Sequence, residues 1–163
     1  MSNCLVSFHR ADSEDLQNLL NFQLTQQEVF YFFPSADYPL TLRQLQKQLS
    51  NRHRSTVMRL KGQLLGFANF YNVENRNIAF IGNVIINPTQ RRKGYGGQLL
   101  QYMIKLGFDE LKLNEVHLSC YSQNTQALLF YQQLGFKPYA LERRKDFNNR
   151  PVIMLHLRLK NPH

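Results

Sequence analysis

A basic, glycine-spaced loop is the part of this sequence best suited to chemistry. The loop, Arg91 to Gly97, follows an apolar run that ends at Pro88 and precedes a helical pattern. Gly94 and Gly96 permit positive φ and close approach of a ligand, and successive N–H groups beside a helix N-terminus favour an anion. Phosphate is the commonest such anion, so the loop predicts a site for a phosphorylated cofactor. A tight strand-to-helix turn with a solvated basic rim is the alternative interpretation.

A second segment, from Asn124 to Phe136, contains a candidate proton donor. Leu128 and Leu134 lie at helical spacing and predict a buried helix face. Tyr131 lies on the same helix, and a phenol is protonated at neutral pH, which suits a general acid. Taken alone, the helix favours an ordinary core tyrosine at Tyr131, and Asn124 is typical of a helix start.

The surrounding pattern predicts the elements that must position these residues. Apolar alternation predicts strands at 5–10, 55–60, 64–71, 78–86, 116–121, 136–140 and 152–159. Helical spacing predicts helices over 12–24, 41–51, 97–111 and 124–134, with helix-start pairs at Asp12/Asp15 and Thr41/Gln44 and a left-handed C-terminal Gly135. Residues 29–39 are aromatic-rich and interrupted by Pro34 and Pro39, which predicts a loop.

Short links between the strands at 55–86 predict antiparallel pairing, whereas the helix after the glycine loop makes its two flanking strands parallel. We therefore expect an α/β (α+β) fold with a mixed, mostly antiparallel central sheet of about seven strands and about four helices. Neither repeats nor linkers divide the sequence, so residues 1–163 are expected to form a single domain.

Composition excludes several classes of protein. The apolar runs are too short to span a bilayer, the N-terminus lacks a signal-peptide design, and no metal-ligand spacing is present. Cys4 and Cys120 offer no disulfide framework, and free thiols fit a reducing, cytoplasmic setting. The net charge is +9, but direct nucleic-acid binding is not favoured without a recognised binding motif. The basic stretch 43–61 is either a solvated face or a docking surface for an acidic macromolecule.

Taken together, the two segments resemble the GCN5-related N-acetyltransferase (GNAT) family. The match comprises Arg91, Gly94 and Gly96 in the loop, and Asn124, Ala127, Tyr131, Gly135 and Phe136 in the helix. The resemblance implies the acyl-CoA N-acyltransferase fold, in which the fourth and fifth strands splay apart. It also implies acetyl-CoA as co-substrate, with no metal.

The resemblance implies a role for each matched segment. The loop would bind the pyrophosphate, the strand before it would pair with the pantetheine arm, and Asn124 would hold the cofactor by hydrogen bonds. Tyr131 would protonate the departing thiolate after direct attack by a neutral amine, with no covalent intermediate. The implied cofactor-binding residues are Val84, Ile85, Ile86, Arg91, Arg92, Lys93, Gly94, Tyr95, Gly96 and Asn124.

The sequence lacks the carboxylates that serve as general bases in some relatives. The strand 78–87 has no acidic residue, and Ser119 stands where a glutamate would precede the second motif. The base is left open between ordered water and the side chains of Glu28, Glu74, Glu142 and His117.

The acceptor is expected to be a small-molecule or peptide amine. The aromatic cluster 30–33 suggests apolar acceptor surface, and the basic balance disfavours a polyamine. Whether the chain forms a homodimer is left open. A non-catalytic acyl-CoA-binding sensor or scaffold is the alternative function.

Overall fold

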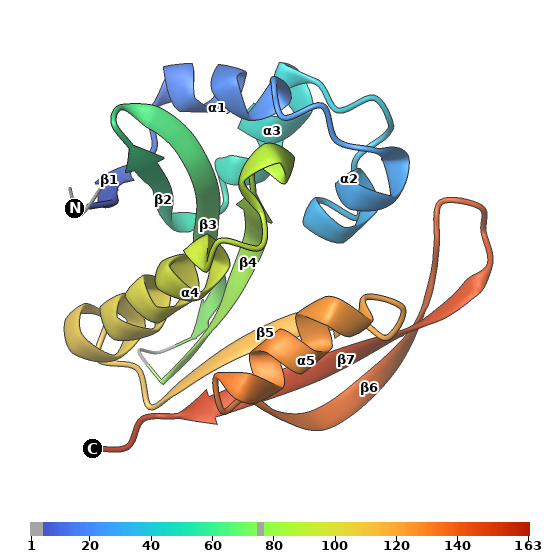
Figure 1. Ribbon diagram of the computed structural model, residues 1–163. Helices are drawn as coiled ribbons and strands as arrows, with labels where there is room; N and C mark the ends of the chain where they lie inside the picture. The colour runs from blue at the N-terminus through green and yellow to red at the C-terminus, as the bar shows by residue number, and fades with distance from the viewer. Residues whose placement is uncertain (1–4, 75–76) are drawn as a thin grey trace.

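The computed structural model describes residues 5–74 and 77–163, so Cys4 lies outside the described residues. In this part of the chain, one seven-stranded sheet is combined with five α-helices (Figure 1). The strands are β1 (Ser7–Arg10), β2 (His53–Leu60), β3 (Gln63–Glu74), β4 (Ile78–Ile86), β5 (Glu115–Tyr121), β6 (Lys137–Lys145) and β7 (Pro151–Lys160). The α-helices are α1 (Ser13–Leu20), α2 (Gln26–Phe32), α3 (Leu42–Leu49), α4 (Tyr95–Lys105) and α5 (Thr125–Gln133). A short 3₁₀ turn, Pro88–Gln90, precedes the glycine loop, and a π-helical turn, Leu106–Glu110, follows α4.

The strand order is β1-β2-β3-β4-β5-β7-β6, and β4 and β5 are the parallel pair among antiparallel neighbours. This confirms the predicted mixed sheet. The parallel pairing extends only from Ile78 opposite Glu115 to Ile81 opposite Leu118. Beyond that point both strands continue without pairing to each other, so they separate in a fork, and Figure 1 shows β4 and β5 diverging.

A bulge in β4 lies directly beside the fork. Three residue steps of β4, from Gly82 to Ile85, face two steps of β3, and Asn83 has a φ of +48°. The Asn83 Nδ2 group donates to the Phe32 carbonyl at 2.8 Å, and its Oδ1 accepts from Asn69 Nδ2 at 3.0 Å. Since Asn69 is fully buried, these bonds fix the bulge and join it to the C-terminus of α2.

The two faces of the sheet have different cores. Val116, Leu118 and Cys120 of β5 belong to a cluster that includes buried residues of α4 and is covered by side chains of α5. The alternate β5 residues, which include Ser119 and Tyr121, must face the other side of the sheet. A second cluster there joins α1, α2 and α3 to strands β2 to β4. The fork is thus bordered by α4 and α5 on one face and by α2 near the other.

The predicted helix-start pairs are confirmed. Asp12 with Asp15 and Thr41 with Gln44 form reciprocal capping boxes at α1 and α3. Gly135 follows α5 with a φ of +95°, a conformation that side chains disfavour.

Our prediction of a loop from residue 29 is wrong for its first part, which belongs to α2. The Thr25 and Glu28 side chains form a further capping box, and Val29, Phe30 and Phe32 are buried along the helix. The apolar packing of these side chains stabilises a short helix despite its aromatic residues.

The predicted strand at 136–140 is too short. Strand β6 continues to Lys145 because Arg143 to Lys145 pair with Ile153 to Pro151 of β7. As an exposed edge strand, β6 lacks the apolar alternation that would have marked it. The helix after the glycine loop likewise ends at Lys105, earlier than predicted, where the π-helical turn begins.

Candidate active site

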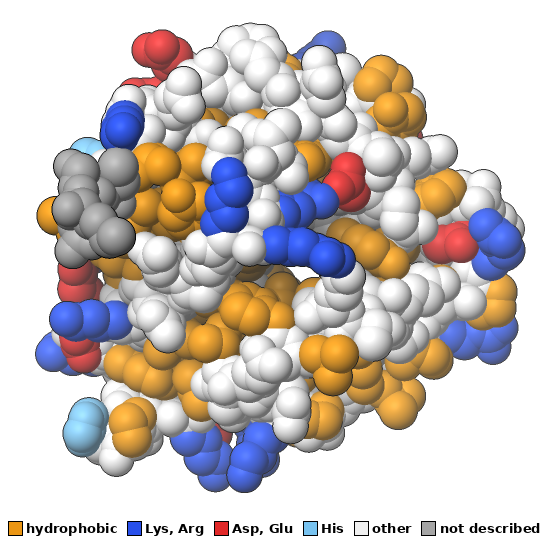
Figure 2. All heavy atoms as spheres, viewed as in Figure 1, with side chains coloured by type: hydrophobic (Ala, Val, Ile, Leu, Met, Phe, Trp, Pro, Cys, Tyr) orange, Lys and Arg blue, Asp and Glu red, His pale blue; other side chains and the backbone are white. Residues whose placement is uncertain are grey.

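The glycine loop lies between the end of β4 and the start of α4, beside the fork. Gly94 is the N-cap of α4 with a φ of +82°, and a Cβ there would meet no atom within 4 Å, so the need for glycine is conformational. Gly96 lies inside α4, so the expectation of positive φ holds for Gly94 and not for Gly96. Figure 2 shows the molecule from the same side as Figure 1. A hollow lies at the centre of this view, with basic side chains at its rim and hydrophobic side chains inside.

The loop side chains are exposed, and Arg91 is the best fixed of them. Its guanidinium forms an ion pair with Glu28 of α2, and its Nε donates to the Ile86 carbonyl at 3.3 Å. Partial burial would raise the pKa of Glu28, but hydrogen bonds from Thr25 and Arg91 hold it below its usual value. A carboxylate held ionised by an arginine of the glycine loop is poorly suited to serve as the general base. Lys93 donates to Gln90 at 2.9 Å.

The two sequence motifs meet at the N-terminus of α4. A Cβ on Gly96 would lie 3.8 Å from Ile86 Cγ1, at the end of β4, and 3.8 Å from Phe130 Cζ of α5. The end of β4, the glycine loop and α5 are therefore in contact. Val84 and Ile86 also pack against the same core cluster as Tyr131.

Tyr131 is partly buried on the α5 side of the fork, with its ring against Phe136 at a centroid distance of 6.3 Å. Burial, assisted by the neighbouring Cys120, raises the pKa of Tyr131 above its usual value. Its hydroxyl has no hydrogen-bond partner among the residues that the structure describes. Tyr131 is thus a neutral phenol whose O–H group is not hydrogen-bonded to any described residue.

Asn124 is the N-cap of α5, as the simpler interpretation expected. Its Oδ1 accepts from the Ala127 N–H at 3.4 Å, a long bond that leaves the Nδ2 donors without a partner in the described chain. Asn124 can therefore cap the helix and still donate to a ligand.

Cys120 is buried next to Tyr131, and burial raises the pKa of its thiol to about 12 from 9.0. The difference, 12 − 9 = 3, lowers the thiolate fraction about 10³-fold at neutral pH. We expect Cys120 to react with Ellman's reagent at least about 100-fold more slowly than a free thiol in a Cys4→Ser background. Cys120→Ala should retain wild-type kcat, with thermal stability measured in parallel. An acetylated Cys120 detected by mass spectrometry during turnover would contradict this.

His117, a candidate base, is engaged at both ring nitrogens. Its Nε2 lies 2.7 Å from Glu115 and its Nδ1 lies 2.8 Å from the Tyr139 hydroxyl. The hydrogen bond from His117 lowers the pKa of Glu115, which is therefore ionised and accepts the Nε2 proton. His117 is a structural residue of the sheet face. Glu74 is exposed at the end of β3.

His156 of β7 is a candidate site residue that could not be identified from the sequence alone. It lies opposite Ser119 in the β5–β7 register, and its Nδ1 is 2.7 Å from Ser119 Oγ. A histidine between Leu155 and Leu157 on a predicted strand was a usable signal, but nothing in the sequence specified its partner across the sheet. Glu142, an earlier candidate base, lies 3.2 Å from His156 Nε2.

Residues 5–74 and 77–163 contain no cluster of three or more His, Cys, Asp or Glu side chains that could hold a metal ion. No helix within these ranges is long and apolar enough to cross a membrane.

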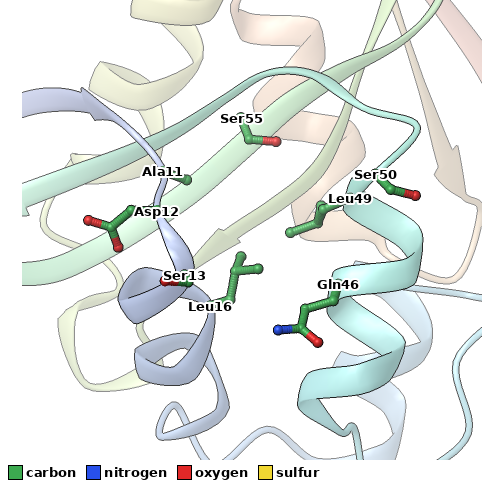
Figure 3. Close-up of a pocket in the computed structure, with 8 residues that line it drawn as sticks. All are labelled: Ala11, Asp12, Ser13, Leu16, Gln46, Leu49, Ser50 and Ser55. Carbon is green, nitrogen blue, oxygen red and sulfur yellow. The ribbon is translucent and has the colours of Figure 1, made fainter.

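A separate open hollow of about 350 Å³ lies between α1 and α3 (Figure 3). Its walls are formed by Ala11, Asp12, Ser13, Leu16, Gln46, Leu49, Ser50 and Ser55. Its charged member, Asp12, already caps α1, and none of these residues belongs to β4, β5 or the glycine loop. The hollow therefore is not the candidate site.

A fork between parallel strands, bordered by a glycine loop at a helix N-terminus, defines an acyl-CoA N-acyltransferase fold. The sequence matches the model of the acetyltransferase (GNAT) family over residues 14–136, and the chain belongs to this family. It is 27% identical over 103 residues to the spermine/spermidine N(1)-acetyltransferase of Bacillus subtilis (strain 168), a match covering 60% of this chain and 66% of that protein. The chain thus spans slightly less than two thirds of that relative's length.

Two further proteins are similar. Acetyltransferase PseH of Campylobacter jejuni subsp. jejuni serotype O:23/36 (strain 81-176) is 32% identical over 85 residues, which are 52% of this chain and 50% of that protein. The structure of spermidine N-acetyltransferase from Vibrio cholerae, in complex with CoA and spermine, superposes with a TM-score of 0.82 at 19% identity. That likeness covers 97% of this chain and 96% of the other, and it shows a shared fold.

Proposed function

We propose that residues 1–163 form a single GNAT N-acetyltransferase domain that moves an acetyl group from acetyl-CoA to a primary amine by direct attack. The observation that carries this proposal is the fork, where a stretch of β4 that is not paired with β5 leads into a glycine loop in contact with the helix of Tyr131. Family membership supports the same reaction class. Acetyl-CoA, when bound, supplies an activated acetyl thioester.

The described residues fit such a cofactor. Strand β4 is not paired with β5 at Val84, Ile85 and Ile86, so its free edge can hydrogen-bond an extended pantetheine arm. The positive φ of Gly94 and the N-terminus of α4 favour a pyrophosphate. The cofactor-binding set that we propose adds Arg91, Arg92, Lys93, Tyr95, Gly96 and Asn124.

Tyr131 is our proposed general acid. Its raised pKa keeps the phenol protonated, and its hydroxyl has no competing partner among the described residues. It holds a proton on the α5 side of the fork, where a departing thiolate could receive it.

The acceptor that the site favours is a primary amine with apolar surface and without several positive charges. Phe30 of α2 stacks on Tyr121 of β5 at 4.5 Å, with Phe147 at 5.8 Å, which forms an aromatic wall. The Arg52 guanidinium lies 4.4 Å over the Tyr71 ring, and the Tyr71 hydroxyl contacts Ser119, which shares a face of β5 with Tyr121. This arginine would repel a polycation, although one relative is described as a spermine/spermidine acetyltransferase.

A mass-spectrometric screen of acetyl transfer to amines, amino acids, peptides and spermidine, together with calorimetric CoA titration, tests the proposal. We expect CoA binding and amine-dependent release of free CoA thiol. CoA binding without thiol release for any amine would favour the sensor or scaffold. Salt-dependent association with RNA or an acidic protein would instead favour a macromolecular acceptor docked at 43–61. We further propose a cytoplasmic location, on the cysteine usage alone.

A further inference from the structure

We infer that Ser119, His156 and Glu142 form a proton relay that replaces the missing carboxylate base and receives the proton of the acceptor ammonium. The inference rests on the proposed function, because a relay of this kind is needed only if an amine must be deprotonated before attack.

The hydrogen bonds of the relay determine where its protons are. Arg144 and His156 both contact Glu142, and the hydrogen bond from His156 lowers the pKa of this carboxyl below its usual value. An ionised carboxylate only accepts, so His156 must carry a proton on Nε2 and donate it across 3.2 Å. In the neutral imidazole Nδ1 is then bare, and it accepts from the Ser119 hydroxyl at 2.7 Å.

Tyr71 extends the chain towards β3. Its hydroxyl lies 3.4 Å from Ser119 Oγ, and its ring crosses β4 over Gly82, where a Cβ would come within 2.7 Å of the ring. Burial raises the pKa of Tyr71, so it remains a neutral donor to Ser119. All bonds therefore run in one direction, from Tyr71 through Ser119 and His156 to Glu142.

The relay begins at the fork. Ser119 is the first β5 residue after Leu118, the last residue paired with β4. Its side chain bonds His156 and Tyr71, whereas the neighbouring Cys120 points into the core under α5 with Tyr131 close by. The proton acceptor and the proposed general acid thus lie on opposite faces of β5.

Proton transfer balances without any further reactant. The ammonium N–H bond breaks as its proton binds Ser119 Oγ, and the original Ser119 proton moves to His156 Nδ1. The products are a neutral amine and an imidazolium, whose charge is balanced by Glu142. After product release, the imidazolium returns its proton to water.

The surroundings favour this histidine over its neighbour. Phe80 of β4 lies edge-on between the two imidazoles, 6.2 Å from the His156 ring and 5.1 Å from the His117 ring. His117 Nδ1 already accepts a hydrogen bond from the Tyr139 hydroxyl, so His117 has no free acceptor nitrogen at the fork. The titratable or charged side chains around His156 are Tyr71, His117, Tyr139, Glu142, Arg144 and, over the Tyr71 and Tyr139 rings respectively, Arg52 and Arg158.

The kinetic test compares His156→Gln with the matched control His117→Gln. Each variant is assayed with two amines: an alkylamine that the wild type acetylates, and a fluorinated analogue of it that is already neutral at pH 7. We expect His156→Gln to lower kcat/KM for the alkylamine about 100-fold at pH 7, with recovery as the pH approaches the amine's own pKa. The neutral analogue should lose less than about threefold, as should both amines with His117→Gln. Ser119→Ala should give the same loss as His156→Gln, and the double variant no more. Equal losses for both amines, or for both histidines, would overturn the relay.

A second measurement does not depend on turnover. ¹⁵N NMR of the free protein, with His156 assigned by its disappearance in His156→Gln, should show that the neutral imidazole is the tautomer with its proton on Nε2 and with Nδ1 bare. A proton on Nδ1 would refute the relay whatever the kinetics. If the wild type acetylates no amine in the screen, the proposed function fails, and the NMR result alone decides whether the relay geometry exists.

Discussion

Tyr131→Phe is expected to lower kcat by about 100-fold or more while leaving the calorimetric Kd of CoA unchanged. The phenylalanine preserves the ring packing against Phe136 but removes the proton that would neutralise the thiolate. Because burial raises the pKa of Tyr131, the proton-donating form persists at high pH. The wild type should therefore show no alkaline loss of kcat from this group until the pH exceeds the ordinary tyrosine pKa near 10.

The control for this variant is Tyr102→Phe, on α4, where Phe8 stacks on the ring at 4.1 Å and no role at the fork is proposed. Its kcat should match the wild type. An unchanged kcat in Tyr131→Phe, with single-turnover kinetics showing that chemistry limits the rate, would remove the general-acid assignment.

Arg91→Glu is expected to raise the Kd of CoA by about 10- to 150-fold, the range for losing a charge-assisted hydrogen bond of about 1.5–3 kcal/mol. In the wild type Glu28 forms an ion pair with Arg91, so the substitution also places a second carboxylate beside Glu28. Calorimetric titration at two salt concentrations measures the effect, which should shrink at higher salt.

Arg143→Glu on the exposed strand β6 is the matched control, since it makes the same change of net charge away from the loop. It should leave the Kd within about twofold. Glu28→Gln is informative in the opposite direction, because it frees Arg91 and should tighten CoA binding. An unchanged Kd in Arg91→Glu would exclude the loop arginine from the cofactor site.

The local structure of the glycine loop and of the α5 start could be predicted because local sequence determines it. The positive φ of Gly94 and the helix start at Asn124 follow from residue types within a few positions. The parallel relation of β4 and β5 follows from the helix between them, and the predicted fold class was confirmed.

The side chains that we propose to act on the acceptor could not be predicted, because their arrangement depends on contacts between strands that are distant in the sequence. The Ser119–His156 contact needs the β5–β7 register, and Tyr71 reaches Ser119 only because Gly82 leaves room. Helix α2 was missed because its aromatic residues and the two nearby prolines outweighed the Thr25–Glu28 capping box. Side chains whose partners lie on a different strand produce no recognisable pattern in the local sequence.

The bond from Asn83 to Phe32 has a consequence for how acceptor preference can change. Asn83 anchors α2 through a main-chain oxygen, which every residue type possesses. Residues of α2 outside the buried core can therefore be exchanged without losing this anchor beside the fork. A library randomised at Gln27, which is exposed, and at Tyr31, which packs beside Tyr121 in the aromatic wall, should thus retain CoA affinity while its amine preference diverges, so that one catalytic frame can serve many acceptors.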